Sequence, residues 1–193
     1  MGFSPFNRKM IAFAYDLEKK DFLNFQLYTS STDENFNKQR KKERYRISGL
    51  TLLFGCILFF EDGYRLYSYC FLGTSVLYFI FYSWWAAWYY KRIYRQQIEQ
   101  HFKDSLPYHM EVSLAEDSVS IRTAKGSRQI GASQLSSITE IKDYFFVEES
   151  VYSTAIIIPK EPLQDVGTVR DMLMSYAESF NIEYSSNLDW VWK

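Results

Sequence analysis

Cysteine and histidine are scarce in this chain, with two of each among 193 residues. Cys56 and Cys70 each lie inside an apolar run, so we expect no disulfide framework and interpret both as small apolar side chains that face lipid or a neighbouring helix. His101 and His109 have neither a cysteine nor a pair of carboxylates at ligand spacing, which argues against a metal site. We therefore predict no metal and no cofactor.

Sequence motifs of catalysis are also missing. The segment 124–127 is a turn with one glycine rather than a glycine-rich lead into a helix, so it does not predict a phosphate-binding loop. No nucleophile elbow occurs, and the neighbouring Glu148 and Glu149 stand at a strand end, where such pairs are usually solvated. A net charge of −1 gives no general attraction for nucleic acid. We expect a protein that is not an enzyme and does not bind nucleic acid.

Two apolar runs are the strongest feature of the sequence. Residues 47–60 carry no charge over 14 positions, and residues 69–90 carry none over 22. About 20 helical residues cross a hydrocarbon core of about 30 Å, so the second run is long enough, whereas the first needs Arg44 and Arg46 to reach the headgroups. The polar segment 61–68 predicts a loop, and the two runs together predict a transmembrane hairpin. The alternative is a buried helical pair, which the mostly polar or strand-forming remainder would have to cover.

The residues that flank the runs predict their orientation. Both outer ends are basic and the loop is not, so the positive-inside rule puts both ends in the cytoplasm. These basic side chains set the topology and are also candidates for binding anionic lipid headgroups, although topology alone explains them. They are Lys38, Arg40, Lys41, Lys42, Arg44, Arg46, Lys91, Arg92 and Arg95. The side chains predicted to form an aromatic belt on the cytoplasmic side are Trp84, Trp85, Trp88, Tyr89 and Tyr90. Those predicted on the far side are Tyr64, Tyr67 and Tyr69.

The segments on either side of the hairpin have their own patterns. Residues 1–46 form a predicted cytoplasmic segment with one strand, Ile11–Leu17, and a helix whose N-cap is Asp21. A lone strand is not stable, so we expect it to pair with the C-terminal sheet. Residues 91–107 continue the second run as an amphipathic stalk helix that ends at Pro107.

Residues 108–193 predict a β-rich domain. The predicted strands are 110–114, 118–122, 127–130, 138–141, 144–147 and 154–158, with a possible extra strand within 188–193. A helix over about 165–180 has one apolar stripe and is positioned to cover the open end of the sheet. The predicted fold class is therefore α+β, with a two-helix transmembrane hairpin and a cytoplasmic antiparallel β-sheet or barrel that ends in a helix and resembles a pleckstrin-homology domain.

The charge of this domain indicates what it binds. Residues 108–193 hold seven basic and thirteen acidic side chains, a net charge of −6. An anionic inner leaflet repels such a domain. We therefore expect it to bind a protein partner rather than phosphoinositide-type headgroups.

Parts of the chain resemble the YcxB-like proteins, which are bacterial two-span membrane proteins with a C-terminal domain of this kind. The resemblance is carried by Phe13-Ala-Tyr15, Asp21-Phe-Leu23, Leu135–Ile138, Ile141, Phe145-Phe146 and, above all, Ile156, Ile157, Ile158, Pro159 and Lys160. It covers most of the chain in layout and some 30 residues in pattern. The family often has a tryptophan near position 135 and a second basic residue where this chain has Glu161. The resemblance implies a bacterial inner membrane, no catalytic residues and no defined biochemical function.

Three functions are left open. The first is a membrane-anchored interaction module that binds a protein partner, and the second is an immunity protein that neutralises a membrane-acting toxin. The third is a subunit of an oligomeric pore or transporter, although neither apolar run holds the ionisable residues that transport usually needs. Ser83 and Ala87 form a small-residue pair at helical spacing, which leaves a homo-oligomer possible.

Overall fold

The computed structural model describes residues 10–102, 106–150 and 155–193. Within them the fold is α+β, with four α-helices and two four-stranded sheets. Its contacts divide the chain into two units. The β unit comprises Met1–Phe25 and Ile98–Val191, and the helical unit comprises Gln26–Gln97 and Trp192–Lys193.

The first sheet of the β unit is antiparallel throughout and contains the N-terminal strand. Its strands, in spatial order, are β1 (Ile11–Leu17), β2 (Tyr108–Leu114), β3 (Ser118–Thr123) and β4 (Gly126–Gly131). The prediction that residues 11–17 pair with the C-terminal sheet is confirmed, because β1 pairs with β2 over its full length. The β unit therefore includes residues that precede the helical hairpin, in addition to most of the predicted domain 108–193.

The second sheet departs from a simple meander. Its spatial order is β7 (Ala155–Pro159), β6 (Tyr144–Glu149), β5 (Leu135–Ile141) and β8 (Glu183–Asn187), and β8 is parallel to β5. The extra strand predicted within 188–193 is thus wrong in position. Asn181 ends the preceding helix in the left-handed conformation, with φ of 53°, so the chain turns back early and β8 follows at once. The sequence did not predict β8 because its residues are mostly polar. An edge strand can be polar, since fewer of its side chains are buried.

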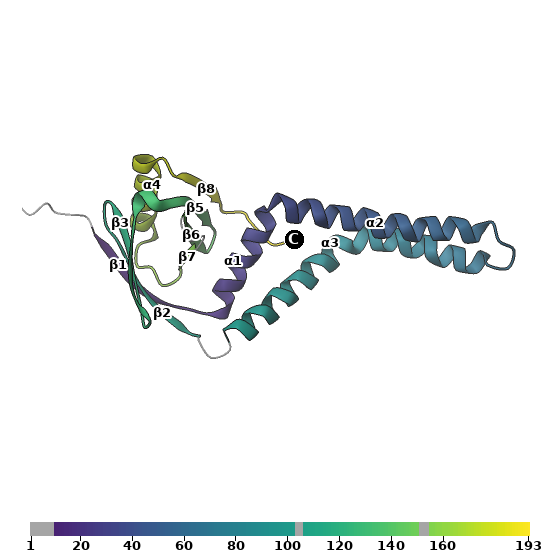
Figure 1. Ribbon diagram of the computed structural model, residues 1–193, viewed down its shortest axis with the longest axis horizontal. Coiled ribbons are helices and arrows are strands. Elements are labelled where there is room, and N and C mark those ends of the chain that lie inside the picture. Colours follow the sequence, from purple (N-terminus) through teal and green to yellow (C-terminus); the bar gives the residue numbers. More distant parts are fainter. Residues whose placement is uncertain (1–9, 103–105, 151–154) are drawn as a thin grey trace, which may run out of the picture. The chain divides into compact units, whose positions relative to one another are not determined.

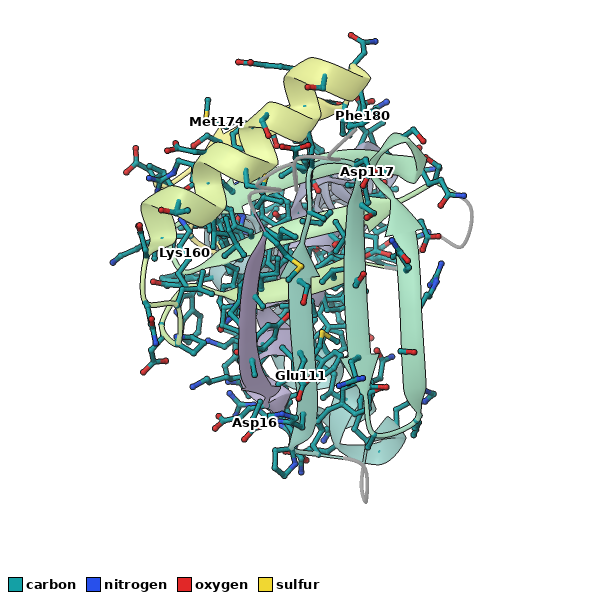
Figure 2. The ribbon with its side chains drawn as sticks, turned by 90° about the vertical axis from the view of Figure 1, so that its left-hand side faces the viewer. Asp16, Glu111, Asp117, Lys160, Met174 and Phe180 are labelled. Atoms are coloured by element: carbon teal, nitrogen blue, oxygen red, sulfur yellow. The ribbon has the colours of Figure 1, made fainter. Side chains whose placement is uncertain are left out.

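One helix covers an end of the two sheets, and the start of another helix covers a face of the second sheet. The predicted helix is confirmed as α4 (Val166–Phe180), and Asp165 caps it by accepting from the Thr168 N–H. Figure 2 shows α4 lying across one end of the two sheets. There Leu173 and Tyr176 are fully buried, and the Tyr176 hydroxyl donates to the Ala115 and Ser118 carbonyls.

The first turns of α1 (Lys19–Thr32) lie on the second sheet. Phe25 meets Phe146 at 5.2 Å between ring centroids, and the Tyr144 hydroxyl donates to the Asp21 carboxylate at 2.8 Å. Asp21 is not the N-cap that the sequence predicted. The helix begins two residues earlier, and the buried Asp21 side chain reaches back to accept from the Glu18 N–H at 2.7 Å. Its carboxylate therefore ties the helix start to the sheet.

The helical unit is dominated by two long antiparallel helices, α2 (Glu34–Phe59) and α3 (Arg65–His101), which lie side by side in Figure 1. The predicted second run and stalk form one continuous helix that ends at His101, short of the predicted 107. Within the described residues, α3 is the one helix that is long and apolar enough to cross a membrane. Helix α2 does not have an apolar stretch of that length. Its first half is rich in charged residues, so its uncharged part is limited to residues 47–59.

Candidate membrane-interface site

The contact between α2 and α3 is built from small residues spaced seven apart. Ser68 donates its hydroxyl hydrogen to the Gly55 carbonyl at 2.7 Å, and Ser75 donates to the Ser48 carbonyl at 2.8 Å. All four of these residues are buried. A spacing of seven keeps contacting residues on one seam of a helix pair, and small residues let the backbones approach closely. At Gly55 an added Cβ would lie 2.9 Å from Leu72 side-chain carbons.

The outer surface of this helix pair is apolar. The large apolar side chains that are exposed on it include Leu50, Leu52, Leu53, Phe54, Ile57, Val76, Leu77, Ile80 and Phe81. Soluble proteins bury such side chains and expose serine, whereas this unit buries serine and exposes leucine and phenylalanine. Both free cysteines, Cys56 and Cys70, lie on this exposed surface. The arrangement fits an apolar solvent.

Two of the predicted basic residues are held within the helix pair. The Arg44 Nε–H donates to the Phe79 carbonyl at 2.9 Å, and its guanidinium carbon lies 3.9 Å from the Phe79 ring centroid. Arg40 lies within 5.8 Å of the ring centroids of Phe36, Tyr90 and Trp192. Arg44 therefore does not extend along the helix toward headgroups, as the sequence suggested, but binds α3.

The other basic residues of the set face solvent. The exposed members are Lys38, Lys41, Lys42, Arg46, Lys91, Arg92 and Arg95. Lys38 pairs with Glu34 at 2.7 Å, and the Arg92 guanidinium carbon lies 5.4 Å from the Trp88 ring centroid. For the remaining five, no carboxylate partner occurs among the described residues. These five side chains are therefore exposed and have no competing carboxylate, as the predicted contact with anionic headgroups requires.

The aromatic and basic residues lie at one level of the helix pair. Phe36 of α2 contacts Tyr90 of α3 at 4.8 Å between ring centroids, and the Tyr82 hydroxyl donates to Glu43 at 3.4 Å. Residues 79–90 of α3 thus run beside the charged half of α2. The uncharged part of α2 faces only the part of α3 nearer the loop, so the second run is not matched by an apolar neighbour over its whole length.

The aromatic belt divides in the same way. Trp84, Trp85, Trp88 and Tyr89 are exposed, whereas Tyr90 faces α2 and Arg40. Trp85 stacks on Tyr89 at 5.0 Å between ring centroids. Indole and phenol rings prefer the headgroup level of a bilayer, where guanidinium and ammonium groups are also stable. The structure therefore assembles a basic and aromatic zone, here the interface zone, from residues 36–46 and 79–95.

The C-terminus contributes to the interface zone, which sequence reasoning missed. The Trp192 indole N–H donates to the Ala87 carbonyl at 2.9 Å, and Arg40 donates to the Lys193 oxygen at 3.3 Å. The apolar pattern of residues 188–193 predicted an extra strand there. A tryptophan on either side of Val191 beside the chain end could have indicated interfacial anchoring instead. Of the small pair Ser83 and Ala87, Ser83 is exposed and Ala87 contacts Trp192.

The residues that carry the YcxB-like resemblance have structural roles. Ile156 and Ile157 are buried in β7, and Pro159 ends that strand. Lys160 donates its ammonium to the buried Glu140 carboxylate at 2.6 Å and to the Ile141 carbonyl at 2.7 Å. The motif therefore builds the core of the β unit rather than a binding surface.

Glu140 is the centre of a buried ionic cluster. It also accepts from Arg170 of α4 at 2.6 Å and from the Tyr184 hydroxyl of β8 at 2.7 Å. Burial alone would raise the pKa of Glu140, but the hydrogen bonds from Arg170, Lys160 and Tyr184 outweigh it and lower the pKa to about 2. One carboxylate of β5 thus joins the segment after β7, α4 and β8.

The histidines do not form a metal site among the described residues. Strand pairing brings Asp16 opposite His109, with 2.6 Å between Oδ1 and Nδ1, which the sequence spacing could not show. Both side chains are more than half exposed. Comparison with known proteins gives no identification: no protein-family model, no curated protein and no solved structure matches the chain.

Proposed function

We propose that this protein is a membrane-anchored interaction module without enzymatic activity. In this proposal α2 and α3 cross the bilayer as a hairpin, and the β unit stands in the cytoplasm and binds a protein partner. The observation that carries it is the inverted packing of the hairpin, with serine and glycine at the seam and leucine and phenylalanine outside.

The length of the hairpin supports a thin apolar span. About 14 residues separate Arg46 from the loop at Glu61, which corresponds to roughly 21 Å of helix. A bilayer accommodates a short span by local thinning and by basic side chains that reach the headgroups. Arg46 is free to do so, and the interface zone would lie at the cytoplasmic headgroup level.

The arrangement of charge supports the orientation. The interface zone concentrates basic side chains at the end of the hairpin that carries both connections to the β unit. The loop end instead has Glu61, Asp62 and Arg65, and Arg65 pairs with Asp62 at 3.7 Å. By the positive-inside rule both chain ends belong on the cytoplasmic side of a bacterial inner membrane.

The architecture of the β unit supports a pleckstrin-homology-like fold and a YcxB-like relationship. Four antiparallel strands, a second sheet and a helix across one end are the layout expected for that fold. The parallel strand β8 is an addition to it. Because residues 108–193 carry a net charge of −6, a protein partner suits this unit better than an anionic lipid surface.

Cysteine labelling in intact and opened cells tests the proposal. In a background with Cys56→Ser and Cys70→Ser, a membrane-impermeant maleimide should label Asp62→Cys in intact spheroplasts. It should label Ser133→Cys, in the β unit, only after the membrane is opened. Full extraction of the protein by alkaline carbonate, or labelling of both positions in intact cells, would overturn it.

A further inference from the structure

An apolar groove lies along one side of α3 in the helical unit. It has a volume of about 390 Å³ and is lined by seven side chains of α3 between Thr74 and Trp85. All of these side chains except that of Thr74 are large and either apolar or aromatic. Pockets that bind small organic ligands have volumes of roughly 300–1,000 Å³ and mostly apolar linings. The groove is therefore large enough to hold part of a lipid chain.

A row of aromatic rings forms one wall of this groove. Tyr78, Tyr82, Trp85 and Tyr89 follow each other along α3, with 5.4, 6.2 and 5.0 Å between successive ring centroids. Tyr82 is buried, and its hydroxyl donates to Glu43 of α2. The wall is therefore anchored to the contact between the two helices.

The exposed side of the groove continues into a basic stretch of the same helix. Six exposed side chains of α3 are spaced alternately four and three residues apart, which puts them on one face of the helix. They are Leu77, Phe81, Trp84, Trp88, Lys91 and Arg95. From Trp85 to Lys91 the helix rises by about 9 Å. The cations therefore follow directly after the end of the groove.

The cations of this face are free to bind a ligand. Neither Lys91 nor Arg95 has a carboxylate partner in the part of the chain that the structure describes. Arg92 lies between them in the sequence, and its guanidinium carbon is 5.4 Å from the Trp88 ring centroid. Ammonium and guanidinium groups bind phosphate, and indole rings are stable at the headgroup level of a bilayer. A phosphate diester is the chemical group that fits this end of the face.

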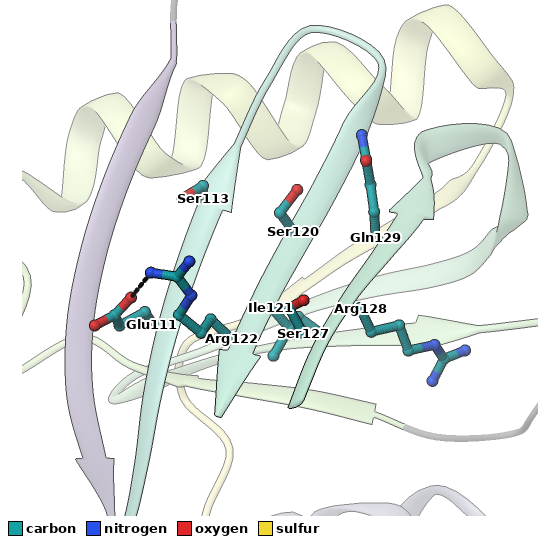
Figure 3. Close-up of a pocket in the computed structure, with 8 residues that line it drawn as sticks. All are labelled: Glu111, Ser113, Ser120, Ile121, Arg122, Ser127, Arg128 and Gln129. Carbon is teal, nitrogen blue, oxygen red and sulfur yellow. Dashed lines mark ion pairs between the residues drawn. The ribbon is translucent and has the colours of Figure 1, made fainter. Parts of the chain in front are cut away.

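The arginines of the first sheet are not free in this way. Figure 3 shows a polar hollow there, of about 460 Å³, in which Arg122 pairs with Glu111 at 3.7 Å. Arg128 also lines this hollow and donates to the buried Glu149 carboxylate. An anionic ligand would have to compete with these carboxylates on the sheet, whereas on α3 it would not.

We infer that this face of α3 is a binding site for an anionic phospholipid of the cytoplasmic leaflet. One acyl chain lies in the groove against the aromatic row, and the headgroup phosphate contacts Lys91 and Arg95. The groove is nearer the loop and the cations are nearer the β unit in the sequence, which is the order of chain and headgroup in that leaflet. The inference rests on the proposed insertion of the hairpin and adds a lipid ligand to it.

The charge of the face argues against a second copy of the chain as its occupant. Two copies inserted in the same orientation would bring the cations Lys91 and Arg95 of one copy against those of the other. Like charges placed opposite each other disfavour association. An anionic lipid instead neutralises these cations while its chain covers the apolar groove.

Removal of charge at two places separates a lipid site from general attraction to an anionic surface. Lys91→Gln combined with Arg95→Gln removes two cations of the proposed site. Lys41→Gln combined with Lys42→Gln is the matched control, because it removes two exposed cations of α2 that likewise lack a carboxylate partner among the described residues. Each double variant loses two positive charges, so general attraction to an anionic leaflet falls equally in both.

Filling the groove tests the part of the site that holds the acyl chain. Thr74→Phe places a ring in the groove, whereas Val76→Phe adds a ring at an exposed position of α3 that does not line it. Neither residue is buried, so both variants should fold, which circular dichroism checks.

Native mass spectrometry of the full-length protein measures the retained lipid. The protein is released into detergent from nanodiscs that contain equal amounts of phosphatidylglycerol and phosphatidylcholine, and the added mass identifies the bound lipid. We expect phosphatidylglycerol to be retained at least about fivefold more often than phosphatidylcholine. Its retention should fall at least about fivefold in the Lys91 and Arg95 double variant and in Thr74→Phe, and should change less than about twofold in the two controls.

Several outcomes would overturn the inference. These are equal retention of the two lipids, equal losses in the two double variants, and unchanged retention in Thr74→Phe. A dimer that retains no lipid would mean that a second copy covers this face, which also contradicts a lipid site. Protein that does not enter nanodiscs at all would refute the proposed membrane anchor instead, so the two failures are distinguishable.

Discussion

Ser75 of α3 donates its hydroxyl hydrogen across the hairpin to the backbone carbonyl of Ser48 on α2, at 2.8 Å. The same relationship recurs seven residues away, where Ser68 donates to the Gly55 carbonyl. A helical carbonyl oxygen accepts one hydrogen bond from its own helix and has a second lone pair. The serine hydroxyl can therefore bind it without breaking a backbone hydrogen bond of α2. The seam therefore combines close backbone approach with buried interhelical hydrogen bonds, and in the proposed bilayer setting no water would compete for them.

The closest approach of the two helices predicts a large effect of one methyl group. A Cβ added at Gly55 would lie 2.9 Å from the Leu72 side chain and 3.2 Å from the Leu72 backbone nitrogen. We expect Gly55→Ala to lower the free energy of unfolding by about 1–3 kcal/mol. Gly73→Ala is the control, because no atom lies within 4 Å of its added Cβ, and it should be neutral or slightly stabilising. Detergent-solubilised protein titrated with dodecyl sulfate and followed by circular dichroism measures both, and equal midpoints for the two variants would contradict the packing described for the seam.

The serine hydroxyls of the seam should differ in their contributions. Ser75→Ala removes an interhelical hydrogen bond and should cost about 0.6–1.7 kcal/mol. Ser48 accepts through its backbone carbonyl, which substitution does not remove, and its own buried hydroxyl has no hydrogen-bond partner among the residues that the structure describes. Ser48→Ala should therefore be neutral or stabilising. The same titration compares them, and a greater loss for Ser48→Ala than for Ser75→Ala would mean that the seam is not held as described.

The Glu140 cluster predicts how the stability of the β unit depends on pH. The pKa of the Glu140 carboxyl group is lowered from the ordinary 4.5 to about 2 in the folded protein. A carboxyl group with a lowered pKa stabilises the fold above its unfolded pKa, and this stabilisation is lost as pH falls from about 4.5 to about 2. Glu140→Gln should lower the free energy of unfolding by about 3 kcal/mol at pH 7, since it leaves the nearly buried Lys160 and the partly exposed Arg170 without their anion.

The pH experiment has a clear control. Glu161→Gln changes a side chain that is 87% exposed and lies 3.8 Å from Lys20, and it should alter stability by less than about 0.5 kcal/mol. Chemical unfolding at pH 7, 5, 4 and 3 should show a loss of stability on acidification in the unsubstituted protein that is smaller in Glu140→Gln. Parallel pH curves for these two proteins would show that another group controls the acid limb.

The apolar pattern of each strand predicted its position well, because the pattern depends on whether one or both faces of the strand are buried. The strands of the first sheet alternate, as Met110–Leu114 does, because one of their faces is solvated. The unbroken run Tyr144–Val147 belongs to the second sheet, whose inner face meets the core and whose outer face meets α1, so both sides are apolar. Period and length of the apolar pattern were enough to locate these strands.

Relationships between distant residues were not predictable in the same way. Glu140, Lys160 and Arg170 are ordinary charges in the sequence. Only the folding of the second sheet brings Lys160 to the buried Glu140 carboxylate, and only the packing of α4 adds Arg170. The serine and glycine seam did leave a signal, a spacing of seven from Ser68 to Ser75 and on to Tyr82. This spacing did not stand out, because serine and glycine add little to the apolar content by which a transmembrane run is recognised.

The position of β1 predicts which fragment of this protein can fold alone. β1 forms the edge of the first sheet, and the Tyr15 hydroxyl donates to the Ile157 carbonyl of β7 at 2.8 Å. A fragment of residues 108–193 lacks both this strand and the start of α1, so it exposes buried side chains of β2 and of the second sheet and should aggregate. Residues 10–25 joined to 98–191 by a flexible glycine–serine linker restore the whole β unit and should give a soluble, cooperatively unfolding protein. Size-exclusion chromatography with thermal unfolding of the two proteins measures this, and a monomeric, cooperative 108–193 fragment would mean that the N-terminal strand is dispensable.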